Sequence, residues 1–578
     1  MAYHAEAVRT GVWHPRAPSW RDLAAMLLVL GVVVLIGTGA RQMVAPFTAL
    51  QQPQISLSPW ALPFYTLRTV MRMLAALIAS LLFTFTYATL AAKSRRAEMV
   101  LIPILDVLQS VPVLGYLSFT VVFFVSLFPG NVLGPELAAI FAIFTSQAWN
   151  MAFSFYQSLR TIPTDLDEAS RGFRASVWQR FWRLEVPFAM PGLIWNMMMS
   201  MSGGWFFVVA SEAISVGNLQ IALPGVGSYV ARAIAAQDLT AIFWAIAAMT
   251  VAILLYDQLL FRPMVAWADK FRFEQTAATV VARSWVLDLF RRSHLLGLVT
   301  APFAALLRRA ARARLALPRG IFRLSFPAPP RRVVDAVGLA FVAAGLLYVG
   351  WSLVSFAGAA LSWEDVATAA RNGALTLLRV AVLIVLASLI WVPIGVAVGL
   401  RPNLTARVQP IAQFLAAFPA NLLFPVAVFL IVRFGLAPKI WLSPLMILGT
   451  QWYILFNVIA GASAFPSDLR EAAASFRVRS PRWWREVMLP GILPYFVTGA
   501  ITASGGAWNA SIVSEAVSWG ATRLSAGGLG AYIAEQTEAG DYPRIALGIA
   551  IMSVLVITMN RLIWRPLYAF AERRTRLD

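Results

Sequence analysis

The chain of 578 residues contains no cysteine, only three histidines and little charge. Without cysteine, disulfide frameworks, thiolate metal sites and cysteine nucleophiles are all excluded. The histidines (His4, His14 and His294) lie outside the long apolar runs, which excludes an imidazole metal site among those runs. Charged residues make up 13% of the chain, against about 25% in soluble domains. A soluble enzyme and a disordered protein are therefore both excluded.

What the chain has instead is apolar sequence in long runs. Hydrophobic residues make up 59% of it, and the mean hydropathy is +0.71. Runs near twenty residues are long enough to cross a bilayer as helices. They fall at about 22–41, 70–92, 100–128, 137–157, 188–210 and 241–261, and again at 335–357, 377–400, 408–432, 440–462, 491–513 and 544–563. We therefore predict an all-α polytopic membrane protein with about twelve spans, six in each half.

The distribution of positive charge orients these spans. Forty-seven Lys and Arg against 27 Asp and Glu give a net charge of +20, which the cationic cytoplasmic loops of a membrane protein explain without nucleic acid. The loops after the second and fourth spans are basic, at 93–96 and 160–183, whereas 515–541 is mainly acidic. We predict a multi-pass protein of the cell inner (plasma) membrane with both termini in the cytoplasm.

The second half repeats the first at an offset of 303 residues. Trp205 matches Trp508 and Glu212 matches Glu515, while Arg72 matches Arg379 at an offset of 307. Because each half has six predicted spans, both copies face the membrane in the same direction. The predicted domains are two six-helix repeats, 1–262 and 333–578, in a fused pseudo-dimer.

A basic linker, 263–332, joins the two repeats. It holds thirteen Lys and Arg against three acidic residues, and its segment 285–314 has apolar residues at helical spacing. The linker is compatible with interfacial helices on anionic lipid or with a docking surface for a partner.

A matched pair of loops follows the fourth span of each half, at 163–187 and 466–490. Each loop contains an acidic residue, two small residues and an arginine at fixed spacing: Glu168, Ala169, Ser170 and Arg174 in the first, and Glu471, Ala472, Ala473 and Arg477 in the second. One such loop alone would fit an ordinary amphipathic connector. Two copies at equal spacing indicate a shared function.

These loops resemble the Glu-Ala-Ala loop of the permease subunits of ATP-binding-cassette importers of type I. A Trp seven residues before Glu, in the pairs Trp205–Glu212 and Trp508–Glu515, is similar to the nitrate, taurine and sulfonate type. In that family the loop is a coupling helix that docks on an ATPase, so the resemblance implies this role for the eight loop residues. The family glycine is replaced by Arg174 and Arg477, which puts the glycine turn in doubt.

Polar residues in the spans are candidates for the translocation path. They are Arg72, Asn196, Ser200, Trp205, Glu212, Arg379, Thr498, Thr502, Trp508 and Glu515. Each has a second interpretation. The arginines could extend to the membrane interface, the tryptophans could be interfacial anchors, the small residues could serve helix packing, and the glutamates could be solvated on the surface.

The chain has no Gly-x-x-x-x-Gly-Lys-[Ser/Thr] phosphate loop and no His/Ser/Asp constellation. We therefore expect a non-catalytic permease without cofactors of its own, with ATP and Mg bound by two partner ATPase subunits. Membrane lipid and a periplasmic binding protein are the other partners that the resemblance implies, and nucleic acid is not among them. The expected substrate is a small anion such as nitrate, a sulfonate or taurine. The alternatives are another polar solute, or a secondary transporter without ATPase partners.

Overall fold

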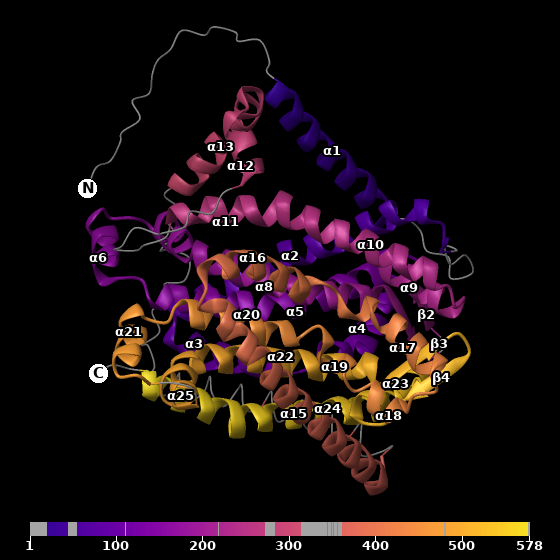
Figure 1. Ribbon diagram of the computed structural model, residues 1–578. Coiled ribbons are helices and arrows are strands. Elements are labelled where there is room, and N and C mark those ends of the chain that lie inside the picture. The colour runs from indigo at the N-terminus through magenta and orange to yellow at the C-terminus, as the bar shows by residue number, and fades with distance from the viewer. Residues whose placement is uncertain are drawn as a thin grey trace.

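The computed structural model is an all-α bundle with two short β-hairpins at one end (Figure 1). It describes residues 20–43, 55–271 except 110 and 218, 284–313, and 361–575 except 479 and 480, with four isolated positions between 344 and 355. The predicted span 335–357 and the linker segment 314–332 therefore lie almost wholly outside the described residues.

Among the described residues of the first half and the linker, twelve α-helices follow the N-terminal helix α1 (Trp20–Met43). They are α2 (Leu62–Lys93), α3 (Arg95–Leu108), α4 (Val113–Leu127), α5 (Leu133–Arg160), α6 (Thr164–Gly172), α7 (Val177–Arg180), α8 (Val186–Glu212), α9 (Val226–Ala235), α10 (Leu239–Tyr256), α11 (Arg262–Ala268), α12 (Trp285–Arg292) and α13 (His294–Arg312). Strands β1 (Ala213–Val216) and β2 (Leu219–Ala222) follow α8. Single π-helical turns at Phe181–Glu185 and Asp257–Phe261 lead into α8 and α11.

The second half repeats this order of elements. Its helices are α15 (Trp363–Gly399), α16 (Pro402–Ala417), α17 (Phe424–Arg433), α18 (Pro438–Trp441), α19 (Leu445–Leu448), α20 (Gln451–Ser463), α21 (Ser467–Ser475), α22 (Leu489–Ser514), α23 (Leu529–Ala539), α24 (Tyr542–Met559) and α25 (Arg565–Thr575). Strands β3 (Ala516–Trp519) and β4 (Thr522–Ser525) follow α22. The π-helical turns also recur, at Trp483–Met488 and Asn560–Trp564.

Seven helices among the described residues are long and apolar enough to cross a membrane, or up to nine if each of two bent pairs is one span. The predicted span 100–128 is wrong as a continuous helix, since α3 ends at Leu108 and α4 begins at Val113. Pro112, which lacks an N–H donor, precedes α4. The predicted span 408–432 is likewise divided, with α16 and the following helix meeting at 72°.

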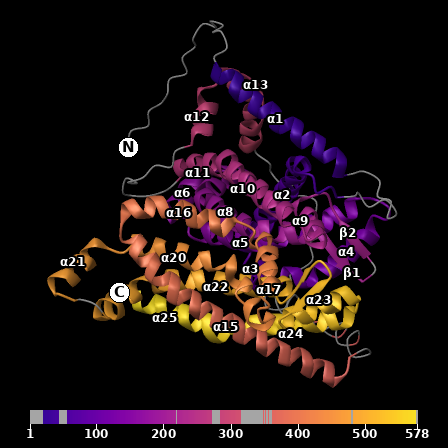
Figure 2. The same ribbon diagram turned by 45° about the vertical axis from the view of Figure 1, so that its right-hand side comes forward.

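Helices of the two halves pack against each other across the centre of the bundle. Within each half, one central helix packs between two others: α5 between α2 and α8, and α20 between α15 and α22. Across the halves, α4 packs against α22 and α24, while α16 packs against α8 and α17 against α10. Figure 2 shows elements of the second half beside those of the first along the bundle. Thus α4 of the first half packs against helices of the second half, and α16 and α17 of the second half pack against helices of the first.

Reciprocal hydrogen bonds confirm the parallel repeat. The N–H of Gly217 donates to the carbonyl of Thr537 at 3.1 Å, and the N–H of Gly520 donates to the carbonyl of Ile234 at 3.0 Å. Both donors and both acceptors are 303 residues apart. Gly217 and Gly520 have φ values of 55° and 58°, which glycine adopts at no steric cost. The halves therefore meet at the hairpin end as two copies of one surface related by a pseudo-twofold axis.

A buried ion-pair cluster joins α2, α5 and α8 at this end of the first half. Arg72 donates through Nε and Nη2 to the Glu136 carboxylate at 2.6 and 2.8 Å, and through Nη1 to Glu212 at 2.6 Å. Arg68 donates to Glu136 at 2.7 Å, and the Thr69 hydroxyl donates to Glu212 at 2.6 Å. All five residues are at most 2% exposed. Two guanidinium groups thus balance two carboxylates out of reach of water.

The second half contains a smaller version of the same cluster. Glu515 accepts from the Thr376 hydroxyl and from Arg379 Nη1, both at 2.9 Å. Arg379 Nη2 also donates to the carbonyl of Ala526 at 2.7 Å, and its Nη1 donates to the carbonyl of Gly527. One ion pair and two backbone acceptors therefore replace the two ion pairs that Arg72 makes in the first half.

Each of the two carboxylates also binds the start of the helix that follows the hairpin. The N–H of Gly227 in α9 donates to Glu212 at 2.7 Å, and the N–H of Gly530 in α23 donates to Glu515 at 2.8 Å. These N–H groups lack partners inside their own helices, and a carboxylate there is favoured by the helix dipole. A β-carbon at Gly227 would come within 2.1 Å of the Val209 carbonyl oxygen. The close approach of α9 to α8 therefore requires glycine.

Removal of the Arg72 charge tests the first cluster. Arg72→Met leaves Glu212 buried without a cationic partner, and we expect a loss of about 3–5 kcal/mol in stability. Arg379→Met should cost less, because Arg379 is partly exposed, with 11% of its side chain accessible. Thermal unfolding of the detergent-solubilised chain measures both effects, with Arg433→Met, an exposed arginine at the end of α17, as the control. Equal midpoints for Arg72→Met and Arg433→Met would contradict the structural role of the cluster.

Candidate translocation cavity and coupling surface

A cavity of about 540 Å³ lies between the two halves. Its walls come from α4, α5 and α8 of the first half and from the α19–α20 region and α22 of the second. Among the described residues that line it, none is acidic or basic. The polar groups of the cavity are hydroxyls and amides, and aromatic rings supply much of the remaining wall. Such a cavity can bind a small polar solute through neutral hydrogen bonds.

Four of the predicted path residues line this cavity. Asn196 and Ser200 come from α8, and Thr498 and Thr502 come from α22. The Asn196 amide donates to the Ser154 hydroxyl at 2.9 Å, which fixes its orientation. Thr498 and Thr502 are exposed, and each hydroxyl donates to a carbonyl of its own helix, which leaves the oxygen free to accept from a solute.

The other predicted path residues do not line this cavity. Arg72, Glu212, Arg379 and Glu515 form the two ion-pair clusters described above, so they are neither solvated nor extended to an interface. Trp205 and Trp508 are 2% and 1% exposed, which excludes the interfacial-anchor interpretation. Trp205 packs edge-on against Tyr256, with ring centroids 5.5 Å apart.

Trp205 also borders a second hollow, of about 850 Å³, between α8, the π-helical turn at 257–261 and α16. Asp257 and Arg262 lie at this hollow and form an ion pair of 3.0 Å. This pair has no counterpart in the second half, because Asn560 stands at the position that matches Asp257.

Sequence reasoning missed several cavity residues. The amides of Asn150, Asn457, Asn509 and Asn560 line the cavity, as does the indole of Trp564. A signal was present, since each asparagine interrupts or adjoins an apolar run where an amide is costly. What hid them is that no asparagine recurs at the matching position of the other half, so the repeat did not single them out.

Six of the eight predicted coupling residues lie on two short helices, α6 and α21, and the other two, Arg174 and Arg477, lie in the turns that follow them. Both helices lie at the same end of the molecule, opposite the hairpins, and in Figure 1 they stand at its left edge. Glu168, Ala169, Glu471 and Ala472 are exposed on them, whereas Ala473 is buried. Ser170 is half-buried, and its hydroxyl donates to the Asp167 carbonyl at 2.8 Å.

Two large aromatic side chains extend from the ends of these helices into the surroundings. Phe173 is 85% exposed and Phe476 is 82% exposed, and the two positions are 303 residues apart. Aromatic residues are enriched in the cores of protein–protein interfaces, whereas charged residues lie mainly at their rims. α6 and α21 therefore expose the same apolar side chain at matching positions of the two halves.

The turn after each coupling helix keeps the conformation that glycine favours. Arg174 and Arg477 have φ values of 50° and 53°, two of only three positive φ values among the described residues other than glycine. The left-handed region costs a non-glycine residue about 1–2 kcal/mol. The replacement of glycine by arginine has thus preserved the turn and added an exposed cation to it.

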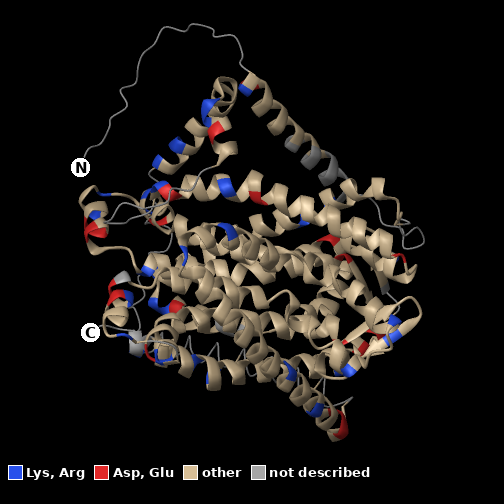
Figure 3. Cartoon of the chain, viewed as in Figure 1, with Lys and Arg blue, Asp and Glu red and all other residues tan. Residues whose placement is uncertain are grey.

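Charged side chains gather toward the two ends of the bundle, and the middle of the bundle is mostly uncharged (Figure 3). Among the described residues, no group of three His, Asp or Glu side chains converges as metal ligands would. The arrangement therefore offers a neutral cavity between two halves and a charged surface at each end.

Comparison with known proteins assigns the chain to a family. The model of the family described as "binding-protein-dependent transport system inner membrane component" matches twice, at residues 84–262 and 391–576. No solved structure matches the chain.

Curated relatives are permease proteins for several solutes. The bicarbonate transport permease CmpB of Synechococcus elongatus is 27% identical over 203 residues, which cover 35% of this chain and 67% of the relative. The glycine betaine/proline betaine permease ProW of Escherichia coli is 30% identical over 173 residues, 30% of this chain and 46% of the relative. The nitrate import permease NrtB of Leptolyngbya laminosa is 24% identical over 190 residues, 33% of this chain and 64% of the relative.

The chain thus spans about half to two thirds of the length of these relatives, and each match covers about a third of the chain. The two segments that the family model matches, 84–262 and 391–576, contain α6 and α21 as well as α8 and α22, the long helices that precede the hairpins. With two copies of the domain in tandem, the chain belongs to the family of binding-protein-dependent transport inner-membrane components, the permease subunits of ATP-binding-cassette importers.

Proposed function

We propose that this chain alone forms the complete translocation path of an importer and couples it to two separate ATPase subunits. Both termini and both coupling helices lie on the cytoplasmic side in this proposal, and a periplasmic binding protein delivers the solute to the hairpin end. ATP and Mg are bound by the ATPase subunits. The observation that carries the proposal is the duplicate coupling surface, α6 and α21, at one end of a bundle whose halves enclose a single cavity.

The eight loop residues have distinct roles in this proposal. Glu168 and Glu471 anchor the ATPase contact, while Ala169, Ser170, Ala472 and Ala473 allow close approach of its surface. Arg174 and Arg477 meet carboxylates or helix C-termini on the ATPase. A secondary transporter gives no reason for two exposed helices with the same phenylalanine and the same left-handed arginine at their ends.

For the solute we propose a small anion such as nitrate, a sulfonate or taurine. The support comes from two of the relatives, which are permeases for bicarbonate and nitrate, and from the amide donors in the cavity. Arg72 and Arg379 give no support, because their charges are already balanced by Glu136, Glu212 and Glu515. Neutral donors in a dry cavity can stabilise an anion as fixed dipoles.

A quaternary ammonium zwitterion is the second candidate. The cavity is lined by Trp149, Trp195 and Trp564, and indole faces attract such cations. Permeases for glycine betaine are among the relatives. Uptake by proteoliposomes that contain the chain and its ATPase subunits, with a panel of anions, betaines and inorganic cations, distinguishes the two classes. Transport of inorganic cations alone would contradict both.

The exposed phenylalanines provide a test of ATPase docking. Phe173→Ala with Phe476→Ala should lower co-purification of the ATPase by at least about tenfold, because each side chain loses a contact worth more than about 1 kcal/mol in an interface core. Thermal stability should not change, since both residues are exposed in the isolated chain. Phe123→Ala, which truncates an exposed phenylalanine on α4, is the matched control. Undiminished co-purification of the double variant would exclude these helices as the docking surface.

The arginines of the two turns can be tested without disturbing the backbone. Arg174→Gly with Arg477→Gly should raise stability by about 1 kcal/mol at each site, because glycine adopts positive φ without strain. The same change should weaken ATPase binding and make the remaining binding less sensitive to salt. Binding measured between low and high salt, beside a thermal unfolding curve, checks both parts. A more stable chain that binds with wild-type salt dependence would show that the arginines make no contact.

A single charge introduced into the cavity wall distinguishes the two classes of solute, small anions and betaines. Thr498→Asp places a carboxylate on the cavity wall, where it repels an anion in a region of low dielectric. We expect anion uptake to fall by at least about tenfold, or about 1.4 kcal/mol, and betaine uptake to fall less. Thr498→Asn has the same shape without the charge and is the matched control. Equal anion uptake by the Asp and Asn variants would show that the solute does not pass this wall.

A further inference from the structure

The linker helices α12 and α13 are fixed to the first half at both ends of α13. At the start of α13, the Asp22 carboxylate of α1 accepts from the Ser293 hydroxyl and from the N–H of Leu295, both at 2.9 Å. Asp22 and Ser293 are each 4% exposed. A buried carboxylate at a helix N-terminus is a stable attachment, because it binds free N–H groups and the dipole favours its charge.

At its other end, α13 is bound by the coupling loop of the first half. The Trp178 indole N–H donates to the carbonyl of Ala310 at 2.7 Å, and the Gln179 amide donates to the carbonyl of Arg312 at 2.7 Å. Both carbonyls lie in the last turn of α13, where carbonyls lack the usual i+4 donor, and the Ala310 carbonyl also accepts from the N–H of Ala313 at 3.1 Å. The next residue, Arg180, pairs with Asp167 of α6 at 2.6 Å. A continuous series of contacts therefore runs from α13 to the coupling helix α6.

The second half cannot make this connection. The positions that match Trp178 and Gln179 are Pro481 and Arg482, and Arg470 stands in place of Asp167. The linker therefore acts on one coupling loop of the two.

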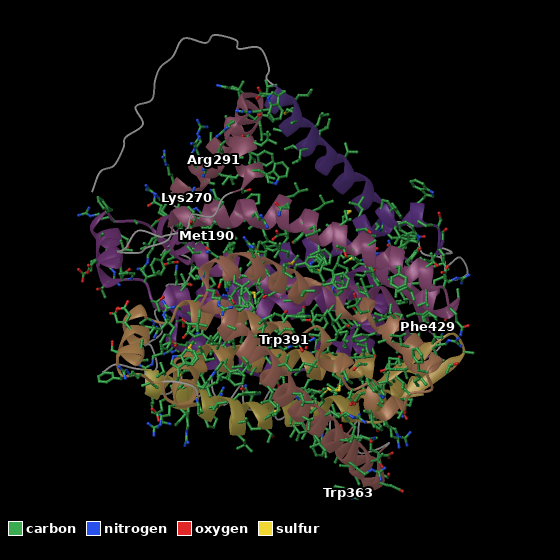
Figure 4. All side chains as sticks on the ribbon, in the orientation of Figure 1. Met190, Lys270, Arg291, Trp363, Trp391 and Phe429 are labelled. Carbon is green, nitrogen blue, oxygen red and sulfur yellow. The ribbon has the colours of Figure 1, made fainter. Side chains whose placement is uncertain are left out.

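The outward face of α13 is apolar and ends in arginine. Phe303 and Leu306 are 64% and 62% exposed, and neighbouring exposed leucines and valine continue the same face at helical spacing. The exposed arginines of its last two turns are Arg308, Arg309 and Arg312. Figure 4 shows two more cations, Lys270 and Arg291, at the same edge of the molecule. Among residues 284–313, Asp288 is the only acidic one.

This combination of an apolar face and unbalanced positive charge fits one occupant, the surface of an anionic membrane. We propose that residues 284–313 form a lipid-binding strap: anionic phospholipid holds α13 at the membrane surface, and α13 in turn holds the first coupling loop. The control of coupling rests on the proposed function of α6, whereas the binding of lipid does not. The strap makes the two coupling loops unequal, because anionic lipid stabilises the position of one of them.

Lipid binding is tested on the full chain in nanodiscs of phosphatidylcholine, with and without phosphatidylglycerol. Cleavage by chymotrypsin after Phe303 reports whether the face of α13 is covered. We expect phosphatidylglycerol to slow this cleavage. Each of the changes Arg308→Gln, Arg309→Gln and Arg312→Gln should reduce this protection by about fivefold. Arg401→Gln with Arg407→Gln, two exposed arginines of the second half, is the control and should keep the protection. Cleavage that is equal in both lipids overturns the proposal.

The link to coupling is tested with the ATPase subunits added. Trp178→Phe removes the donor to Ala310 and keeps the ring, so phosphatidylglycerol should still protect Phe303 but should no longer change solute-stimulated ATP hydrolysis. Stimulation that depends on phosphatidylglycerol to the same degree in the variant overturns the link between strap and loop. Failure of any ATPase to assemble contradicts the proposed function and leaves the cleavage result in place. Protection of Phe303 by added ATPase in phosphatidylcholine alone would instead assign the face to the ATPase.

Discussion

The carboxylates of Glu212 and Glu515 determine how each half closes at the hairpin end. Each lies buried at the C-terminal end of a long helix. Each binds a threonine and an arginine of α2 or α15, and an N–H group at the start of the helix after the hairpin. A buried carboxylate without these partners would cost several kcal/mol. Three helices of each half must therefore keep their relative positions at the hairpin end.

The fold was largely predictable from hydropathy and from the repeat. The helical bundle and the parallel orientation of its halves followed from long apolar runs and from the repeat. Seven to nine candidate spans lie among the described residues, against about twelve predicted for the whole chain. The break between α3 and α4 was not predictable in the same way, because both helices are apolar and only Pro112 marks the boundary. The continuity of a span depends on packing against the other half, and a hydropathy window does not report it.

Some residues of the candidate site were predicted from the sequence and others were not, and the repeat explains the difference. Residues that recur at matching positions are those that each half needs for its own structure, such as the Arg72–Glu212 pair and Arg174 with its positive φ. The cavity is shared once by both halves, so its walls need not match. Thr498 lines the cavity, and its counterpart at the offset of 303 residues is Trp195, a cavity residue of different chemistry. Matching positions in the two halves therefore indicated the residues of the ion-pair clusters and the predicted coupling residues, but they did not indicate the amides of Asn457 and Asn509.

The covalent joining of the two halves has a genetic consequence for the cavity. In a permease assembled from two identical chains, every substitution appears on both walls of the path at once. Here a single codon alters one wall only, as the matched but different cavity residues Trp195 and Thr498 illustrate. In a symmetric path, a bulky or charged replacement would narrow the path from both walls. In this chain it changes one wall, and the opposite wall stays as it was. Selection can thus fit this path to a solute that has no symmetry of its own.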